Sequence, residues 1–270
     1  ATPVFVDIDK ETYNMSEESL KKMISNKTKA IILVHMYGLM ANIHAINKIA
    51  KKNKINLIED CAQSNGSKLK NIKAGKLSKI SCFSFYPSKN LSTFGDAGAI
   101  ITSDKKLANK CFKIRQYGWN DKRESVINGI NSRMDELHAS ILNIKLKNLI
   151  KENNIRNKKA NIYLKNLKNE NVSLPIIKKN YYHSFHLFVI FVKKRDKLRK
   201  FLKLNNIDTL LHYAKPLHKH KNFNSFKKDS LINTEKIYKG ILSLPLNLDI
   251  TIKEQLRIIK LIKYFYKNNL

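Results

Sequence analysis

Short apolar runs alternate with amphipathic stretches along the first half of the chain. The apolar runs have the length of strands and lie at Val4–Ile8, Ala30–Val34, Ile55–Ile58, Ile80–Tyr86 and Ala99–Thr102. Between them, apolar residues at helical spacing predict helices that begin near Ser16, extend from about Asn42 to Lys54, and continue through Leu107 to Arg115. This alternation predicts an α/β fold with a mainly parallel sheet that helices cover on both faces.

The second half of the chain begins with a long predicted helix from Asp135 to about Asn166, which breaks before Pro175. Further strands are predicted at His186–Val192 and Ile207–His212, and further helices at Arg195–Leu204 and Ile252–Tyr266. We therefore expect a large α/β domain over residues 1–145, a long linking helix over residues 146–170 and a small C-terminal α+β domain over residues 171–270.

The composition is that of a globular protein, with 270 residues of which 43% are hydrophobic and 27% are charged. The 52 Lys and Arg against 21 Asp and Glu give a formal net charge of +31, which invites a nucleic-acid interpretation. However, the lysines are spread evenly among abundant Asn and Ile, and Arg, which reads bases bidentately, is scarce. This pattern is typical of an AT-rich genome, so no nucleic-acid partner is expected.

The positions of the cysteines and histidines indicate the cellular compartment and whether a metal site is expected. The three cysteines lie far apart and form no CxxC pair, which favours a reducing, cytoplasmic location over a disulfide framework or a zinc site. The closely spaced His212, His218 and His220 suggest a metal, but no HExxH pattern or accompanying Cys/Asp set supports one, so none is expected. The longest apolar stretches have only strand length, so no membrane span and no membrane partner are expected.

Polar clusters follow the predicted strands, where α/β proteins place their functional groups. Asp60 and Gln63 follow one strand, and Lys89 follows the next. A lysine flanked by apolar strand ends can have a lowered pKa and form an imine with a carbonyl compound. In a chain so rich in lysine, however, a solvated loop position for Lys89 is the default interpretation.

Several longer sequence motifs favour a functional role for Lys89 over a solvated loop position. They are TKAIILVHMYG from Thr28, EDCAQSNGS from Glu59, FSFYPSKNLSTFGDAGAI from Phe83, RQYGW from Arg115, GINSRMDELHASIL from Gly129, HYAKPLH from His212 and LSLPLNLDIT from Leu242. In this order they resemble the DegT/StrS family of nucleotide-sugar aminotransferases over essentially the whole chain. The resemblance implies the fold of type I pyridoxal-phosphate enzymes, which work as dimers with active sites at the subunit interface.

The resemblance also implies roles for the residues that follow the strands. Lys89 is similar to the lysine that holds pyridoxal phosphate covalently and moves the proton, and Asp60 to the carboxylate that pairs with the pyridinium nitrogen. Gln63 matches a residue beside the ring and its phenolic oxygen, and Ser84 resembles a phosphate ligand. In Ser84 the hydroxyl could equally satisfy backbone groups of a strand.

Four further residues match the segments near the substrate or the partner subunit. Asn131 and Arg133 match a segment that reaches the partner's phosphate or substrate, so Asn131 is a cofactor-binding candidate and Arg133 a substrate-binding one. Alternatively, this segment starts the long helix, with Asn131 or Ser132 as N-cap. His212 and Tyr213 match a loop near the substrate, and a packed role in the core is the alternative.

The resemblance implies transfer of an amino group from an amino acid, with glutamate expected, to a keto-sugar nucleotide in surface-polysaccharide or lipopolysaccharide synthesis. A lysine at position 89, where dehydrating family members carry histidine, favours amino transfer. A homodimer with shared active sites is expected. Relatives carry an N-terminal portion with the first strand, several helices and a phosphate-binding turn. We therefore expect a truncated chain with an incomplete large domain, or alternatively an inactive remnant that at most dimerises with an intact paralogue.

Overall fold

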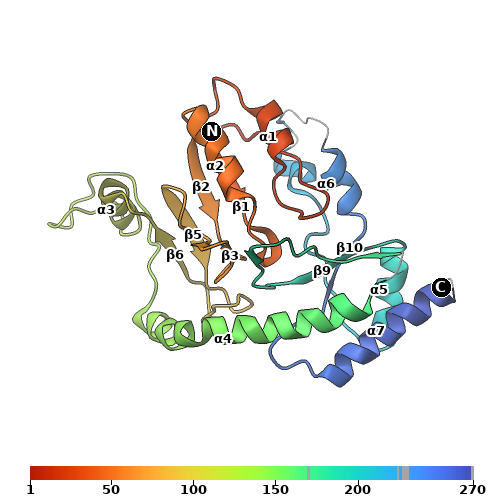
Figure 1. The fold of residues 1–270 in the computed structure, drawn as a ribbon. Coiled ribbons are helices and arrows are strands. Elements are labelled where there is room, and N and C mark those ends of the chain that lie inside the picture. Colours follow the sequence, from red (N-terminus) through yellow and green to blue (C-terminus); the bar gives the residue numbers. More distant parts are fainter. Residues whose placement is uncertain (169–170, 224, 227–230, 269–270) are drawn as a thin grey trace.

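The computed structural model describes residues 1–168, 171–223, 225–226 and 231–268, with a main sheet in the N-terminal half and a second helix-covered sheet in the C-terminal half (Figure 1). The α-helices are α1 (Glu17–Met23), α2 (Ile43–Lys52), α3 (Lys105–Ile114), α4 (Glu136–Asn166), α5 (Arg195–Leu204), α6 (Ile232–Ile237) and α7 (Ile252–Lys267). The strands are β1 (Ala30–Val34), β2 (Asn56–Asp60), β3 (Lys68–Leu69), β4 (Ile72–Lys73), β5 (Ile80–Ser84), β6 (Gly98–Ile101), β7 (Val172–Ser173), β8 (Tyr181–Tyr182), β9 (Phe188–Val192) and β10 (Ile241–Leu244).

The main sheet has the strand order β1-β2-β5-β6. The first three strands are parallel, and β6 pairs antiparallel with β5 at the edge, so the mainly parallel sheet expected from the sequence is confirmed. Because β1, β2 and β5 run in the same direction, their carboxyl ends lie at one edge of the sheet. The loops after β2 and β5 therefore start side by side.

The two faces of the main sheet differ in cover. One face buries Leu33 and Leu57 under α1 and α2, in a core that also contains Ile43 and Ile46. Side chains on the opposite face include Ile32, which is 61% exposed, and Ile100, which is 53% exposed. This second face, which carries Asp60 and Cys82, is here called the open face; α3 lies beside it, where Cys111 is close to Cys82.

The C-terminal half has its own apolar core. Strands β10, β9 and β7 form an antiparallel sheet, and α5 and α7 pack together against it. The long helix α4 runs along the lower edge of the molecule in Figure 1 and carries Ala160 and Tyr163 into this core. The division of the chain at residues 145 and 170 stays a prediction, because α4 itself spans residue 145 and residues 169–170 lie outside the described part.

Two predicted strands are absent from the described structure. The segment Val4–Ile8 makes only an isolated bridge between Ile8 and Met15, and its Asp7 carboxylate instead accepts hydrogen bonds from the backbone of Asn233 and Thr234 at 2.9 and 2.8 Å. Asp7 thus caps the start of α6, which orders the segment without a strand partner. The predicted strand Ile207–His212 likewise pairs only through a bridge from Leu210 to Ser243.

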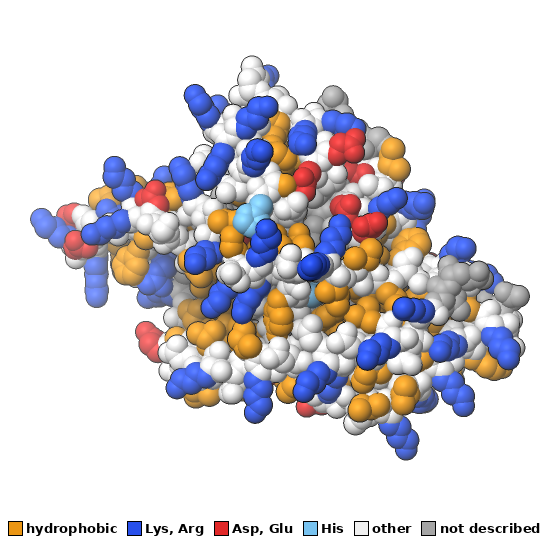
Figure 2. Space-filling view, in the orientation of Figure 1, with side chains coloured by type: hydrophobic (Ala, Val, Ile, Leu, Met, Phe, Trp, Pro, Cys, Tyr) orange, Lys and Arg blue, Asp and Glu red, His pale blue; other side chains and the backbone are white. Residues whose placement is uncertain are grey.

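Figure 2 shows Lys and Arg side chains scattered over the visible face, with acidic and hydrophobic groups between them. Among the helices of the described residues, none combines the length and the apolar character that crossing a membrane requires.

Candidate active site

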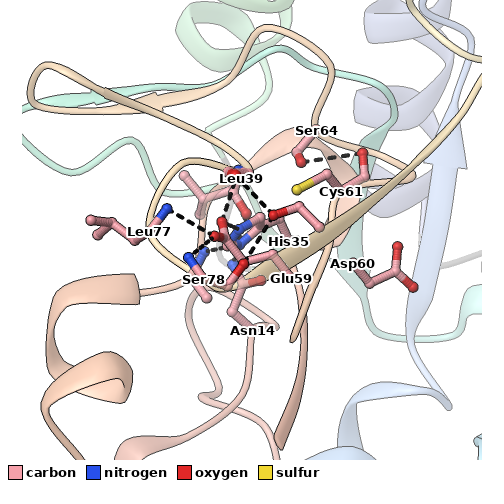
Figure 3. Close-up of polar contacts among 12 residues, drawn as sticks. Asn14, His35, Leu39, Glu59, Asp60, Cys61, Ser64, Leu77 and Ser78 are labelled. Atoms are coloured by element: carbon pink, nitrogen blue, oxygen red, sulfur yellow. Dashed lines mark hydrogen bonds and ion pairs between the residues drawn. The ribbon is translucent and has the colours of Figure 1, made fainter. Parts of the chain in front are cut away.

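The consecutive residues Glu59 and Asp60 end β2 on opposite faces of the main sheet, because side chains alternate along a strand. Glu59 pairs in register with Leu33 and Ser81 on the covered face, whereas Asp60 pairs with Val34 and Cys82 on the open face. Figure 3 shows Asp60 pointing away from the cluster that surrounds Glu59. The two carboxylates therefore have separate environments and separate tasks.

Glu59 belongs to a buried hydrogen-bond network that ties three chain segments together. His35 Nδ1 accepts from the N–H of Ala41 at 3.1 Å, so its Nε2 carries the proton that it donates to Glu59 at 2.8 Å (Figure 3). The Glu59 oxygens also accept from the N–H groups of Gly75, Leu77 and Ser78. Burial alone raises the pKa of Glu59, but these donors hold it at about 2, so the group is a structural anion.

The same network includes a geometry that could be mistaken for a metal site. Ligand atoms of His35, Glu59 and Cys61 lie within 4.8 Å of one another in the interior. The hydrogen bonds already engage both ring nitrogens of His35 and both oxygens of Glu59, and burial raises the pKa of the Cys61 thiol, so we assign this cluster to structure. His35 was not predicted from the sequence, although its place directly after an apolar strand was the available signal.

On the open face, Asp60 and Lys89 lie close enough to interact electrostatically. Lys89 follows β5 in a turn, where its N–H donates to the carbonyl of Tyr86 at 2.8 Å. Burial lowers the pKa of the Lys89 amine, and the Asp60 carboxylate partly opposes this. Oδ1 of Asp60 accepts from the N–H of Ala62 at 2.9 Å, and no bond to Oδ2 is found within the described part of the chain. A half-buried amine thus lies near a carboxylate that has no ion-pair partner among the described residues.

Ser84 ends β5 on the same face, two residues beyond Cys82, the register partner of Asp60. Among the described residues, its hydroxyl makes only a long contact of 3.4 Å, as acceptor, with the N–H of Tyr86. The alternative that this hydroxyl satisfies a strand backbone is therefore weakly supported, and its proton is available to a ligand.

Gln63 is fixed by bonds at both ends of its amide. The N–H of Tyr37 donates to Oε1 at 2.7 Å, so the Nε2 group points to the Tyr213 hydroxyl and donates to it at 2.8 Å. The Tyr37 hydroxyl in turn donates to the carbonyl of His212. The loop that contains His212 and Tyr213 is thereby held against the segment that follows β2.

His212 and His186 add two imidazoles beside Lys89. Burial and the positive charge of Lys89 lower the pKa of His212, so its ring is neutral near pH 7. Burial, followed by Lys89 and Arg156, lowers the pKa of His186 to about 3. His186 belongs to this group of residues but was not predicted from the sequence. It was placed at the start of the strand His186–Val192, and no motif beside it indicated a function. The structure thus brings Asp60, Gln63, Lys89, His212 and Tyr213 together.

Asn131 and Arg133 lie outside this group of residues. They are exposed in the segment between α3 and α4, where the side chain of Arg133 donates to Asn131 Oδ1 at 3.0 Å and lies over the Tyr117 ring. The alternative that Asn131 or Ser132 caps the long helix is wrong, because the N-cap is Asp135. Asn131 instead pairs with Gln116 through an isolated bridge, which places it before the helix.

The fold and this arrangement of polar groups at the carboxyl ends of parallel strands are typical of α/β enzymes. The DegT/DnrJ/EryC1/StrS aminotransferase family model matches residues 1–263, and the chain belongs to this family. It is 40% identical over 265 residues to the dTDP-3-amino-3,6-dideoxy-alpha-D-galactopyranose transaminase of Aneurinibacillus thermoaerophilus, with 98% of this chain and 73% of that protein covered.

Solved structures agree with the family assignment. DesV of S. venezuelae, solved in complex with a ketimine intermediate, superposes with a TM-score of 0.94 at 33% identity, covering 98% of this chain and 72% of that one. NtdA of Bacillus subtilis, solved with bound cofactor PMP, gives a TM-score of 0.88 at 29% identity, covering 98% and 62%. The predictions of the family, of a type I aminotransferase fold and of a pyridoxal-phosphate-dependent sugar aminotransferase are confirmed.

The residues of the open face fit this cofactor chemically. Lys89 offers an amine whose lowered pKa favours attack on an aldehyde, and Asp60 offers a free carboxylate oxygen for a pyridinium nitrogen. Ser84 offers a hydroxyl proton for a phosphate oxygen, and Gln63 lies in the same group of residues. When bound, pyridoxal phosphate supplies an electron sink for a substrate carbanion.

Proposed function

We propose that this chain transfers an amino group from an amino acid, with glutamate as donor, to the keto group of a nucleotide-linked sugar. The observation that carries this proposal is the half-buried Lys89 amine, whose pKa is lowered and which lies near Asp60, a carboxylate without an ion-pair partner in the described part of the chain. A lysine that is neutral for part of the time can take a proton from a substrate carbon and return it to another atom. The reaction belongs to cell-surface polysaccharide or lipopolysaccharide synthesis.

Each remaining polar group of the site has a binding task in this proposal. Asp60 pairs with the ring nitrogen of the cofactor and keeps it protonated, while Gln63 lies beside the ring and adds no charge. Ser84 donates a hydrogen bond to the phosphate of its own subunit, and Asn131 donates one to the phosphate in the site of the second subunit. His212 and Tyr213 bind the sugar substrate, and Arg133 contacts the substrate or the phosphate in the site of the second subunit as a cation.

We further propose a homodimer in the cytoplasm, with active sites shared between subunits. Asn131 and Arg133 are exposed on a segment at one side of the molecule in Figure 1, which suits contact with a second subunit. Apolar side chains of β6, α3 and α4 are exposed around this segment, including Ile100, Phe112 and Leu137. Exposed apolar groups on neighbouring elements favour burial against a partner.

The experiment that tests this function compares the wild type with Lys89→Ala after incubation with pyridoxal phosphate. The wild type is expected to gain a visible absorbance band and, on reduction with borohydride, the mass of one cofactor on the peptide that contains Lys89. Both signals are expected to disappear in Lys89→Ala and to persist in Lys10→Ala, a control at an exposed lysine. Labelling without preference for Lys89 contradicts the cofactor assignment.

The substrate is tested separately with the loaded wild type. Glutamate is expected to convert the visible band to that of the amine form of the cofactor, and a keto-sugar nucleotide is expected to restore it, as ping-pong kinetics require. Loading at Lys89 without conversion by any amino donor would support the inactive remnant instead.

A further inference from the structure

A serine on β10 holds the ring of His212. Ser243 Oγ and His212 Nδ1 lie 2.8 Å apart, and Ser243 is buried. The backbones of Ser243 and Leu210 also exchange two hydrogen bonds, of 2.9 and 3.3 Å. The ring of His212 and the chain just before it are therefore both fixed to β10, an edge strand of the C-terminal sheet.

The partners of the Ser243 hydroxyl determine the tautomer of His212. Within the described residues, His212 Nδ1 is the single side-chain partner of this hydroxyl. If Nδ1 carried the ring proton, the buried Ser243 proton would have no acceptor there, and an unsatisfied buried donor is unfavourable. The favoured arrangement has the Ser243 proton on the Oγ–Nδ1 line and the ring proton on Nε2.

We propose that Ser243 is a positioning residue that holds His212 in the Nε2–H tautomer, so that His212 donates a hydrogen bond to an oxygen of the sugar substrate. This inference rests on the proposed function for the identity of the substrate. His212 and Ser243 both line a cavity of about 590 Å³ whose wall combines the apolar Leu187 and Leu210 with the charged Asp208 and Arg257. Of the residues grouped around Lys89, His212 is the one in this wall. In such a partly apolar wall, an oriented N–H gives direction to a ligand that packing alone does not orient.

The charges around His212 are consistent with a neutral donor. Lys89 faces the ring from the loop after β5, and His186 faces it from the segment before β9. The ring of Tyr213 lies edge-to-face against the ring of His212, with the two ring centroids 5.9 Å apart. A second positive charge beside Lys89 is unfavourable, so the ring acts through its N–H and not as a cation.

The tautomer is measured by long-range ¹H–¹⁵N NMR on chain labelled with ¹⁵N-histidine, with His212→Gln used to assign the signals. The wild type is expected to show His212 as the Nε2–H tautomer. Ser243→Ala is expected to lose this preference, Ser243→Thr to retain it, and Ser81→Ala, which removes another buried serine hydroxyl, to leave it unchanged. An Nδ1–H ring in the wild type, or an unchanged ring in Ser243→Ala, overturns the proposal.

Kinetics of the loaded enzyme test the use of this N–H. Ser243→Ala is expected to lower kcat/KM for the keto-sugar nucleotide about tenfold, mainly through KM, and Ser243→Thr to restore it. Equal constants for the wild type and Ser243→Ala overturn the role toward substrate. If the wild type transfers no amino group while the tautomer still depends on Ser243, the proposed function fails and the positioning of His212 stands.

Discussion

Glu59 and Asp60 are neighbours in the chain, yet their carboxylates lie on opposite faces of the main sheet. The backbone alternation of β2 separates them, so one becomes a structural anion bound by His35 and the other is left free toward Lys89. This separation lets one short motif supply both the rigidity of the site and its chemistry. Substitutions at the two positions are therefore expected to have different effects.

Removing the charge of Glu59 should destabilise the fold. In Glu59→Gln, an amide replaces an oxygen that accepts from a backbone N–H, and the N–H of His35 loses its ionic acceptor. Loss of a charged partner in a buried network costs about 3 kcal/mol. The unfolding free energy in urea measures this cost, and Asp60→Asn, which is expected to change it by less than about 1 kcal/mol, is the matched control.

The stability should also depend on pH through Glu59. Its pKa is about 2 in the folded chain and near 4.5 in the unfolded one, so the unfolded state binds the proton first as pH falls. The contribution of Glu59 is therefore complete above about pH 5 and is lost progressively between about pH 4.5 and pH 2, to a total of about 3 kcal/mol. Comparing urea unfolding of the wild type and Glu59→Gln from pH 3 to 7 should show their difference shrink toward acid pH. A constant difference would argue against this linkage.

Asp60→Asn should impair the reaction and spare the fold. The amide lacks the negative charge that keeps the pyridinium nitrogen protonated, so the cofactor ring withdraws electrons from the substrate less strongly. We expect kcat to decrease by about 100-fold or more, with cofactor still bound to Lys89. Steady-state kinetics and the visible spectrum measure the two effects, and Asp196→Asn at a surface ion pair should alter neither.

Local pattern was sufficient to predict much of the fold. The apolar runs at β1, β2 and β5 and the amphipathic spacing of α2, α5 and α7 indicated those elements, because burial of one face imposes a period on the sequence. The segment Val4–Ile8 has the same apolar pattern, but its order depends on Asp7 capping a helix more than 200 residues away. A prediction from local sequence pattern cannot identify a partner so distant in the chain.

The candidate site shows the same division between local and distant information. Asp60, Gln63 and Lys89 were predicted because strand ends gather functional groups and the motifs resemble a family. His35, His186 and Ser243 were missed because their roles depend on partners from other segments, namely Glu59, Lys89 and His212. A buried histidine and a buried serine look alike in sequence whether they support a core or a site.

Tyr213→Phe should reduce activity through Gln63. The substitution removes the acceptor of the Gln63 Nε2 group, while the Oε1 end stays held by the N–H of Tyr37. One free amide end loosens the loop that contains His212, and we expect kcat/KM to fall about tenfold, with a stability loss of about 1 kcal/mol. Tyr266→Phe in α7, which removes a hydrogen bond from the Tyr266 hydroxyl to the backbone carbonyl of Lys193, should match the stability loss and leave the kinetics unchanged. Equal kinetic losses in the two variants would contradict a special role for Tyr213.

Two inactive variants should restore activity when combined, if active sites are shared between subunits. Lys89 lies in the half-buried group of the open face, whereas Arg133 is exposed on the segment before α4 and interacts with Asn131 and Tyr117. If Arg133 acts in the site of a second subunit, a mixed dimer of Lys89→Ala and Arg133→Ala contains one site with both defects and one site with neither. Random reassociation from denaturant of equal amounts then gives about one quarter of the wild-type specific activity. Each variant refolded alone is the control, and a mixture no more active than these would show that Arg133 serves its own subunit or none.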